Sequence, residues 1–327
     1  HIEIVKLLLN DERIDVNKTY KYSQTPFFIS CENGYNEIVK LLLSDERIDL
    51  NKEQIQGVTP FHIAIIKGHI EIVKLLLSDD RVDVNKPNKY GETPFSVACS
   101  RGHIETVKLL LNDNSVDINK ADKQGQTPFQ IACQIGCIVK LLLNDKRVDV
   151  NKGNKIDQTP FYIACEQGHI DIVKLLFNNE RVDVNQANDC DRTPLYIACF
   201  YGYFDIVKLL LNDKRIDINR GNDDGETPFF IACANGHIEI VKLLLNDNRI
   251  DVNNARNSGE TPFDVACRNN RTDLVKLLLN DERIDVHQGE KINGFTPLHC
   301  ICKSNQFEIV QFILAMRREI NLNIKDN

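Results

Sequence analysis

The sequence has no long apolar run and no excess of positive charge. A Lys, Asp or Asn interrupts every hydrophobic segment, so none approaches the roughly 20 consecutive apolar residues of a membrane-spanning helix. The 40 Lys and Arg residues are outnumbered by 47 Asp and Glu, and the formal net charge is −7. This balance opposes attraction to phosphate backbones and anionic lipids. We therefore expect no nucleic-acid partner and no direct membrane insertion.

The sequence also lacks an initiator Met and a basic-then-apolar leader, because it begins at His1. We interpret it as a fragment of a longer protein that continues in both directions. The 11 Cys are an odd number, and their spacing follows a helical scaffold rather than a disulfide framework. A reducing compartment is therefore expected, with the cytoplasm as the first choice and the nucleus left open.

Proline is scarce, and its placement shows a repeat. Nine of the ten prolines follow a Thr, and these pairs recur every 34 residues, apart from one interval of 32 and one of 35. A fixed period in this range indicates a repeat architecture. The Thr–Pro pairs begin at Thr25, Thr59, Thr93, Thr127, Thr159, Thr193, Thr227, Thr261 and Thr296.

Each copy predicts two short helices, which we name helix A and helix B. In one copy Thr227 is a good N-cap and the following Pro suits the first position of helix A. Gly236 ends helix A, and the amphipathic run from Ile238 to Leu245 forms helix B. The turn-rich residues 254–259 predict an extended finger with a tight turn. Because such short helices are marginal alone in water, they must pack against neighbouring pairs.

The motifs within each copy carry a family resemblance. Thr59 to Ala64 reads Thr-Pro-Phe-His-Ile-Ala, Thr296 begins Thr-Pro-Leu-His, and most copies continue with Gly-His and then Val-Lys-Leu-Leu-Leu. Along nearly its whole length the sequence resembles the ankyrin repeat family, although its period is one residue longer than the usual 33. The resemblance implies an all-α solenoid of helix-turn-helix pairs with extended β-turn fingers. It also implies partners that contact the finger tips and the exposed end of helix A.

We expect a single domain over residues 1–327. It starts with a half repeat at 1–17 that holds helix B alone, followed by nine helix pairs that begin near residues 25, 59, 93, 127, 159, 193, 227, 261 and 296. The half repeat leaves an apolar face uncovered, so end-to-end association is the alternative to a monomer. The copy at Thr127 is two residues short where helix B should start, between Gly136 and Val139. A local irregularity is predicted there.

Residues that recur in every copy are interpreted as scaffold rather than chemistry. We predict that the Cys found six residues after the repeat Thr is a buried free thiol, because stacked helices are too far apart for a disulfide. The His at the helix turn is predicted to pack there, and recurring Lys and Arg-x-Asp residues such as Lys174, Arg181 and Asp183 to form exposed pairs of small value. Since no catalytic constellation occurs once only, we expect no enzyme, no cofactor and no metal site.

Residues that differ between copies are the candidate partner-binding site. Phe200 and Tyr201 stand where other copies have mostly polar pairs, and exposed aromatics are typical of binding hot spots. Tyr162, Tyr196 and Phe230 lie three residues after the repeat Thr, where they either line the adjoining groove or pack between repeats. The later fingers are acidic and the earlier ones carry paired lysines, which would orient a partner of opposite polarity. The acidic candidates are Asp189, Asp191, Asp223 and Asp224, and the lysines are Lys86, Lys89, Lys120, Lys123, Lys152 and Lys155.

The sequence therefore predicts a protein-interaction scaffold that binds a partner of unknown identity through a concave groove and the finger tips. Two alternatives remain open. Near-identical stacked repeats also make a mechanical spacer or elastic tether. The repeats would equally serve as the regulatory or targeting segment of an enzyme encoded outside these 327 residues.

Overall fold

The computed structural model describes residues 2–286, 297–303 and 307–315. His1 and the repeat Thr296 lie outside the described residues. The chain divides into two compact units, residues 1–155 and residues 156–327, and each is described by itself. The expectation of a single domain over residues 1–327 stays a prediction.

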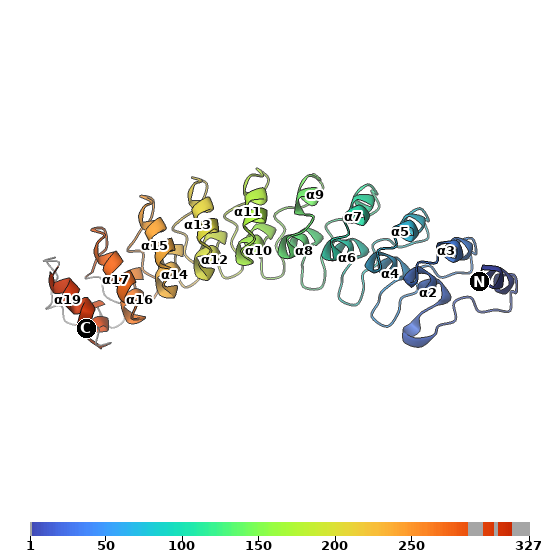
Figure 1. Ribbon diagram of the computed structural model, residues 1–327, viewed down its shortest axis with the longest axis horizontal. Coiled ribbons are helices and arrows are strands. Elements are labelled where there is room, and N and C mark those ends of the chain that lie inside the picture. The colour runs from blue at the N-terminus through green and yellow to red at the C-terminus, as the bar shows by residue number, and fades with distance from the viewer. Residues whose placement is uncertain (1, 287–296, 304–306, 316–327) are drawn as a thin grey trace. The chain divides into compact units, whose positions relative to one another are not determined.

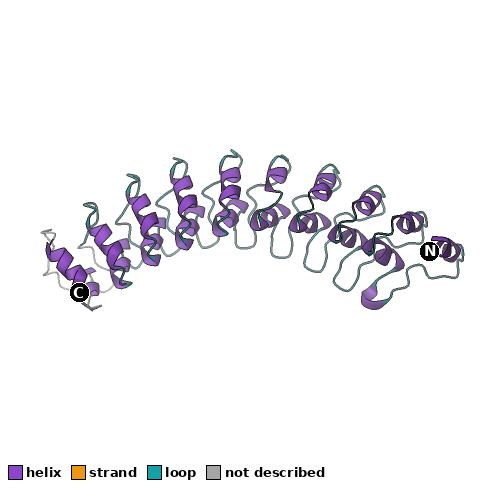
Figure 2. Cartoon of the chain, in the orientation of Figure 1, coloured by secondary structure: helices purple, strands orange, loops and turns teal. Residues whose placement is uncertain are grey.

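Both units are built from short helices joined by turns and loops, with no strand among the described residues (Figures 1 and 2). The helices of the first unit are α1 (Ile2–Leu9), the 3-10 turn η1 (Lys21–Ser23), α2 (Pro26–Glu32), α3 (Asn36–Leu43), α4 (Pro60–Ile66), α5 (Ile70–Leu77), α6 (Pro94–Arg101), α7 (Ile104–Leu111), α8 (Pro128–Ile135) and α9 (Val139–Leu143). Those of the second are α10 (Pro160–Glu166), α11 (Ile170–Phe177), α12 (Pro194–Tyr201), α13 (Phe204–Leu211), α14 (Pro228–Asn235), α15 (Ile238–Leu245), α16 (Pro262–Arg268), α17 (Thr272–Leu279), α18 (Pro297–Lys303) and α19 (Phe307–Ala315).

The predicted signals set the ends of helix A. The hydroxyl of Thr227 accepts a hydrogen bond from the Phe230 amide, Pro228 is the first residue of α14, and Gly236 follows the helix with a left-handed φ of 76°. Helix α15 then covers Ile238–Leu245, as the sequence predicted. The same Thr cap begins α2, α4, α6, α8, α10, α12 and α16.

Like helices stack on like helices within each unit. In the first unit α2, α4, α6 and α8 contact one another in succession, and in the second α10, α12, α14, α16 and α18 do the same. The helix B elements form a parallel row, from α11 to α19 in the second unit (Figure 1). The helix A row holds much of the core, because the first six residues of α4, α6, α8, α10, α12, α14 and α16 are all buried. The solenoid of helix-turn-helix pairs is therefore confirmed.

The fingers are closed hairpin turns that are tied to their neighbours. In one finger the Asn222 amide donates to the Glu226 carbonyl at 3.0 Å, which closes the turn. The Asp223 amide donates to the carbonyl of Cys190 in the preceding finger at 3.1 Å, and the Asn257 amide of the next finger donates to Asp224 at 2.8 Å. The finger tips thus form a regular, hydrogen-bonded row.

An Arg and an Asn side chain join successive helix pairs. The guanidinium of Arg249 is bidentate to Asp247 and also donates to the carbonyl of Leu211, the last residue of the preceding helix B. The Asn219 side chain donates to the Arg249 carbonyl at 2.8 Å and accepts from the Asp251 amide at 2.9 Å. We call the first contact the arginine clamp and the second the asparagine clip. The Arg-x-Asp segment was predicted to form exposed ion pairs within one repeat. In the structure it also connects one repeat to the preceding one.

The short copy is irregular, as predicted. Its helix B, α9, spans only Val139–Leu143, whereas most others have eight residues. Ile138 precedes α9 with a left-handed φ of 49°. A positive φ is unusual for a β-branched residue, so the two missing residues are accommodated by local backbone strain.

The first helix has an uncovered apolar face, as expected for a half repeat. Helix α1 has no buried residue, and Leu7 is 72% exposed. An apolar groove of about 380 Å³ lies beside it, lined among others by Leu8, Ile14, Ile29 and Leu42.

Candidate partner-binding surface

Phe200 and Tyr201 lie at the exposed end of α12. Residues Pro194–Cys199 of this helix are all buried, while the rings of Phe200 and Tyr201 are 36% and 47% exposed. Gly202 follows with a left-handed φ of 80° and ends the helix, which leaves both rings beyond the buried part. The predicted exposure of these two side chains is confirmed.

These rings belong to a continuous aromatic cluster of Tyr196, Phe200, Tyr201 and Tyr203. The Phe200 ring stacks against Tyr196 with 6.5 Å between centroids, meets Tyr201 edge to face at 5.0 Å, and Tyr201 stacks on Tyr203 at 5.8 Å. Both edge-to-face and offset contacts at these distances are favourable for aromatic pairs. The exposed rings are therefore held in place before any partner arrives.

The backbone beneath the cluster is also held. The carbonyl of Phe200 accepts hydrogen bonds from the Asn235 side chain at 2.9 Å and from Nε2 of His237 at 3.1 Å, both in the next pair. A rigid aromatic surface loses little conformational entropy on binding, which is the property expected of an anchor for a partner.

The prediction that Tyr162, Tyr196 and Phe230 line an open groove is wrong. Each is 1% exposed, so the alternative of packing between repeats is the one the structure adopts. Finger arginines cover two of the rings: the Arg192 guanidinium lies 5.9 Å from the Tyr196 centroid, and that of Arg256 lies 5.7 Å from Phe230. Such cation–π contacts replace water on the ring face. Arg192 lies four residues before Tyr196 in the same copy, and Arg256 comes from the finger that follows Phe230, but nothing in the repeat pattern indicated that either side chain covers a ring.

Burial and neighbouring carboxylates raise the pKa of both buried tyrosines, and the Tyr196 hydroxyl also has a hydrogen-bond partner. The Tyr196 hydroxyl donates to the Glu226 carboxylate at 3.0 Å, and burial, reinforced by that carboxylate, raises the pKa of Tyr196. Burial and the nearby carboxylate of Glu166 likewise raise the pKa of Tyr162. Burial in turn raises the pKa of Glu166, which accepts a hydrogen bond from Gln158 at 3.2 Å.

A row of alternating charges follows the buried rings. Arg256 lies 3.5 Å from Glu226 and 2.8 Å from Glu260, and Arg268 lies 2.8 Å from the other oxygen of Glu260. Arg192 stands at the start of this row, and no described carboxylate forms an ion pair with it. Glu226, Arg256, Glu260 and Arg268 thus all take part in ion pairs, whereas Arg192 has no ion-pair partner among the described residues.

The acidic finger residues are exposed, as their position in the turns predicts. Asp189, Asp191, Asp223 and Asp224 all face solvent. Asp191 forms an ion pair with Arg220 at 2.8 Å, whereas no described cation pairs with the other three. Three of the four finger carboxylates therefore have no ion pair within the described residues.

The lysines of the earlier fingers fall into two groups. Lys86 and Lys120 are half-buried and donate to the carbonyls of Asn51 and Asn85, at 3.1 and 3.0 Å. Their charge is therefore partly committed to joining repeats. Lys89, Lys123, Lys152 and Lys155 are exposed.

Known protein families match this chain over most of its length. A family model described as ankyrin repeats in three copies matches residues 1–88, 80–154, 136–222 and 215–290, and an ankyrin repeat model matches residues 293–327. The chain belongs to the ankyrin repeat family. Ankyrin repeats are generally modules of protein–protein interaction and are typically non-catalytic. A search of curated proteins found no match to the chain.

The recurring Cys and His of these ankyrin repeats have structural roles in the described residues. Cys31, Cys99, Cys133, Cys165, Cys199, Cys233 and Cys267 are buried free thiols, as predicted. Cys302, at the same offset in the last copy, is exposed, so the prediction of a buried thiol is wrong there. Nε2 of His69 contacts the Glu32 carbonyl at 3.0 Å, and its ring lies so close to Gly34 that a Cβ there would come within 2.8 Å. Cys137 replaces this His in the short ankyrin repeat, and its thiol reaches the Cys99 carbonyl at 3.7 Å.

Two further features of the ankyrin chain bear on its chemistry. Over the described ranges, no group of three or more His, Cys, Asp or Glu side chains is placed to hold a metal ion. None of the helices in the described part of the chain is both long and apolar enough to cross a membrane.

Proposed function

We propose that this chain binds a partner protein through a surface made of Phe200, Tyr201 and the acidic finger tips, which we call the aromatic–acidic surface. The observation that carries the proposal is the aromatic cluster, in which two partly exposed rings are fixed by ring contacts and by hydrogen bonds to the backbone beneath them. Rigid, clustered aromatics are the side chains that most often dominate binding energy.

The acidic finger tips give this surface an orientation. Asp189, Asp223 and Asp224 are exposed and have no ion-pair partner among the described residues, so the complementary surface carries Lys or Arg at that end. Such charges raise the association rate and fix the register more than they add affinity. The partner therefore presents an apolar side chain to the rings and basic side chains to the fingers.

Quantitative capture of partners by variants of the whole chain tests this proposal. Phe200→Ala and Tyr201→Ala should each lower the amount of specific partner retained by about tenfold, in keeping with the loss of a hot-spot side chain. Tyr90→Ala is the matched control, because Tyr90 is a 56% exposed aromatic in a finger of the first unit. Equal capture by the wild type and by Phe200→Ala and Tyr201→Ala would reject the aromatic–acidic surface.

A second function, that of an elastic tether, is supported by the contacts between repeats. The arginine clamp and the asparagine clip recur from pair to pair and add side-chain hydrogen bonds to apolar stacking, as in Arg81 to Leu43, Asn51 to Arg81 and Arg283 to Leu245. If the chain bears load, Asn219→Ala should lower the force at which the second unit unfolds in a single-molecule pulling measurement. An unchanged force would remove the support for this function.

A further inference from the structure

Arg192 differs in charge from the residues that precede the repeat Thr in the other described copies. The position just before the repeat Thr holds Gln126, Gln158, Glu226 and Glu260 in other copies, and a cation only at Arg192 within residues 2–286. Its guanidinium covers the Tyr196 ring, and its Nε is buried without a hydrogen-bond partner. This position is therefore a local reversal of charge.

Two carboxylates near the buried tyrosine rings are engaged elsewhere, and the exposed Asp189, three residues before Arg192, forms no ion pair with it. Glu226 accepts from the Tyr196 hydroxyl and from the Asn222 side chain, and it also pairs with Arg256. Glu166 accepts from Gln158. A buried or half-buried guanidinium is costly without a carboxylate, and its planar donors suit bidentate pairing. The protein thus presents donors for an anion that its own described residues do not supply.

Arg192 and the exposed rings form one surface. The Arg192 guanidinium and the Phe200 ring both lie against Tyr196, at 5.9 and 6.5 Å from its centroid, so they are within roughly 12 Å of each other. An extended peptide spans that distance in about four residues.

We propose that Arg192 is the specificity residue of the aromatic–acidic surface and that it pairs with an Asp or Glu of a partner peptide whose nearby apolar side chain packs on Phe200 and Tyr201. This inference rests on the proposed function and adds the chemistry of the ligand. The partner peptide carries a carboxylate toward Arg192 and basic residues toward the fingers. The charge order follows from the free cation at Arg192 and the free acids at Asp189, Asp223 and Asp224.

Selection of short random peptides by display on phage, with the whole chain as bait, tests the inference. Peptides enriched by the wild type should contain an Asp or Glu at a fixed spacing from an aromatic or large aliphatic residue. Baits carrying Arg192→Gln should lose the acidic preference and keep the apolar one, whereas the double variant Phe200→Ala, Tyr201→Ala should enrich neither. Gln is the residue found at this position in three other repeats.

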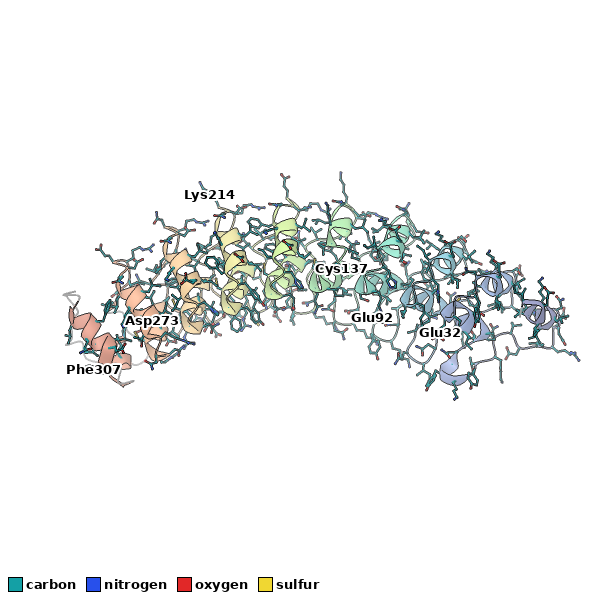
Figure 3. The ribbon with its side chains drawn as sticks, viewed as in Figure 1. Glu32, Glu92, Cys137, Lys214, Asp273 and Phe307 are labelled. Carbon is teal, nitrogen blue, oxygen red and sulfur yellow. The ribbon has the colours of Figure 1, made fainter. Side chains whose placement is uncertain are left out.

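The strongest peptide is then synthesised with its acidic residue and with the matching amide. The amide should bind the wild type about tenfold more weakly, since a charge-assisted hydrogen bond is lost, and should bind Arg192→Gln no more weakly than the acid does. Lys214→Gln is the matched control for net charge. Lys214 lies in the loop after α13 and extends into solvent away from the helices (Figure 3), so this variant should keep the acid preference.

The outcomes separate the two proposals. Peptides that need Phe200 and Tyr201 but tolerate the amide, or that discriminate equally with Arg192→Gln, overturn the role of Arg192 and leave the aromatic–acidic surface in place. Peptides that bind independently of both rings overturn the surface itself. Enrichment of no peptide counts against both.

Discussion

The guanidinium of Arg249 crosses from one helix pair to the pair before it and donates to the carbonyl of Leu211 at 2.8 Å. Leu211 is the last residue of α13, and the final carbonyls of a helix have no partner within the helix. A cation at a helix C-terminus also interacts favourably with the helix dipole. One side chain therefore satisfies the end of one repeat while it is fixed by Asp247 in its own.

The arginine clamp predicts a gain of stability at the copy that lacks it. Ser115 stands where other copies have Arg, and its hydroxyl donates to Asp113. Ser115→Arg should place a guanidinium on Asp113 and on the carbonyl of Leu77, by analogy with the neighbouring copies. We expect the free energy of unfolding to rise by about 0.5–1 kcal/mol in urea titrations.

The reverse change provides the control for that gain. Arg249→Ala removes an existing clamp and should lower the free energy of unfolding by about 1 kcal/mol. A clamp that mattered only as an exposed Arg–Asp pair would give changes close to zero in both directions. No effect in either variant would therefore show that the link to the preceding helix contributes nothing.

His62 predicts a pH dependence of stability. Its ring is buried, with Nδ1 on the Thr59 hydroxyl at 2.8 Å and Nε2 on the Glu92 carbonyl at 3.2 Å. Burial lowers the pKa of His62 from 6.5 to about 4. Between these values the unfolded chain binds a proton that the folded chain does not, so stability falls as the pH drops from 6.5 toward 4. The full contribution is roughly 3 kcal/mol.

A conservative variant isolates this effect from other titrating groups. Gln130 occupies the equivalent position in a later copy and makes the same reciprocal cap, with its side chain on the Thr127 amide at 2.7 Å. His62→Gln should keep the cap and unfold with a weaker pH dependence between 6.5 and 4. Superimposable pH profiles for the two proteins would contradict the assigned pKa shift.

Asp157 predicts a stabilising substitution at a finger tip. The tip residue two before the repeat Thr is Gly in most copies, but Asp157 and Asp191 hold it with φ of 54° and 56°. Because this conformation suits Gly better, Asp157→Gly should raise the free energy of unfolding by up to about 1 kcal/mol. Asp191→Gly should gain less, since it also loses the ion pair with Arg220. Thermal unfolding of both variants measures the difference, and a loss of stability in Asp157→Gly would contradict the prediction.

Truncation of two side chains on helix α12 should lower the free energy of unfolding by very different amounts. Tyr196→Ala removes a fully buried ring and should cost about 3–5 kcal/mol of unfolding free energy. Tyr201→Ala, on a half-exposed ring, should cost less than about 1 kcal/mol while weakening partner capture. Urea denaturation of both variants checks this, and a large loss in Tyr201→Ala would assign that ring to the core.

The fold was predictable because each repeat states its own boundaries. Thr227 and Gly236 mark the two ends of α14 through local chemistry, and the recurrence of the Thr in nine copies and of the Gly in seven removed the ambiguity of short helices. The exposure of Phe200 and Tyr201 was also predictable. They stand where most other copies carry polar side chains, so this position is not part of the buried core of the repeat.

The misassigned residues depend in part on side chains that come from the next copy. The Tyr196 hydroxyl donates to Glu226, thirty positions away, and the Phe230 ring is covered by Arg256 of the following finger. Arg192 lies only four positions before Tyr196, but no motif of the repeat indicates that it covers the ring. The arginine clamp spans 38 positions, from Arg249 to Leu211. The recurrence of Arg and Asn at fixed offsets was the available signal for these contacts between repeats.

The buried cysteine thiols in successive repeats can serve as chemical probes of local unfolding. Burial raises the pKa of thiols such as Cys31 and Cys233, and a thiol reacts chiefly as the thiolate, so alkylation must wait for the surrounding helices to part. The rate at which each sulfur is alkylated therefore reports the free energy of local opening of its own repeat. The copy with Ile65 in place of Cys is silent and Cys302 is exposed, so the seven buried thiols together would map where along the chain opening begins.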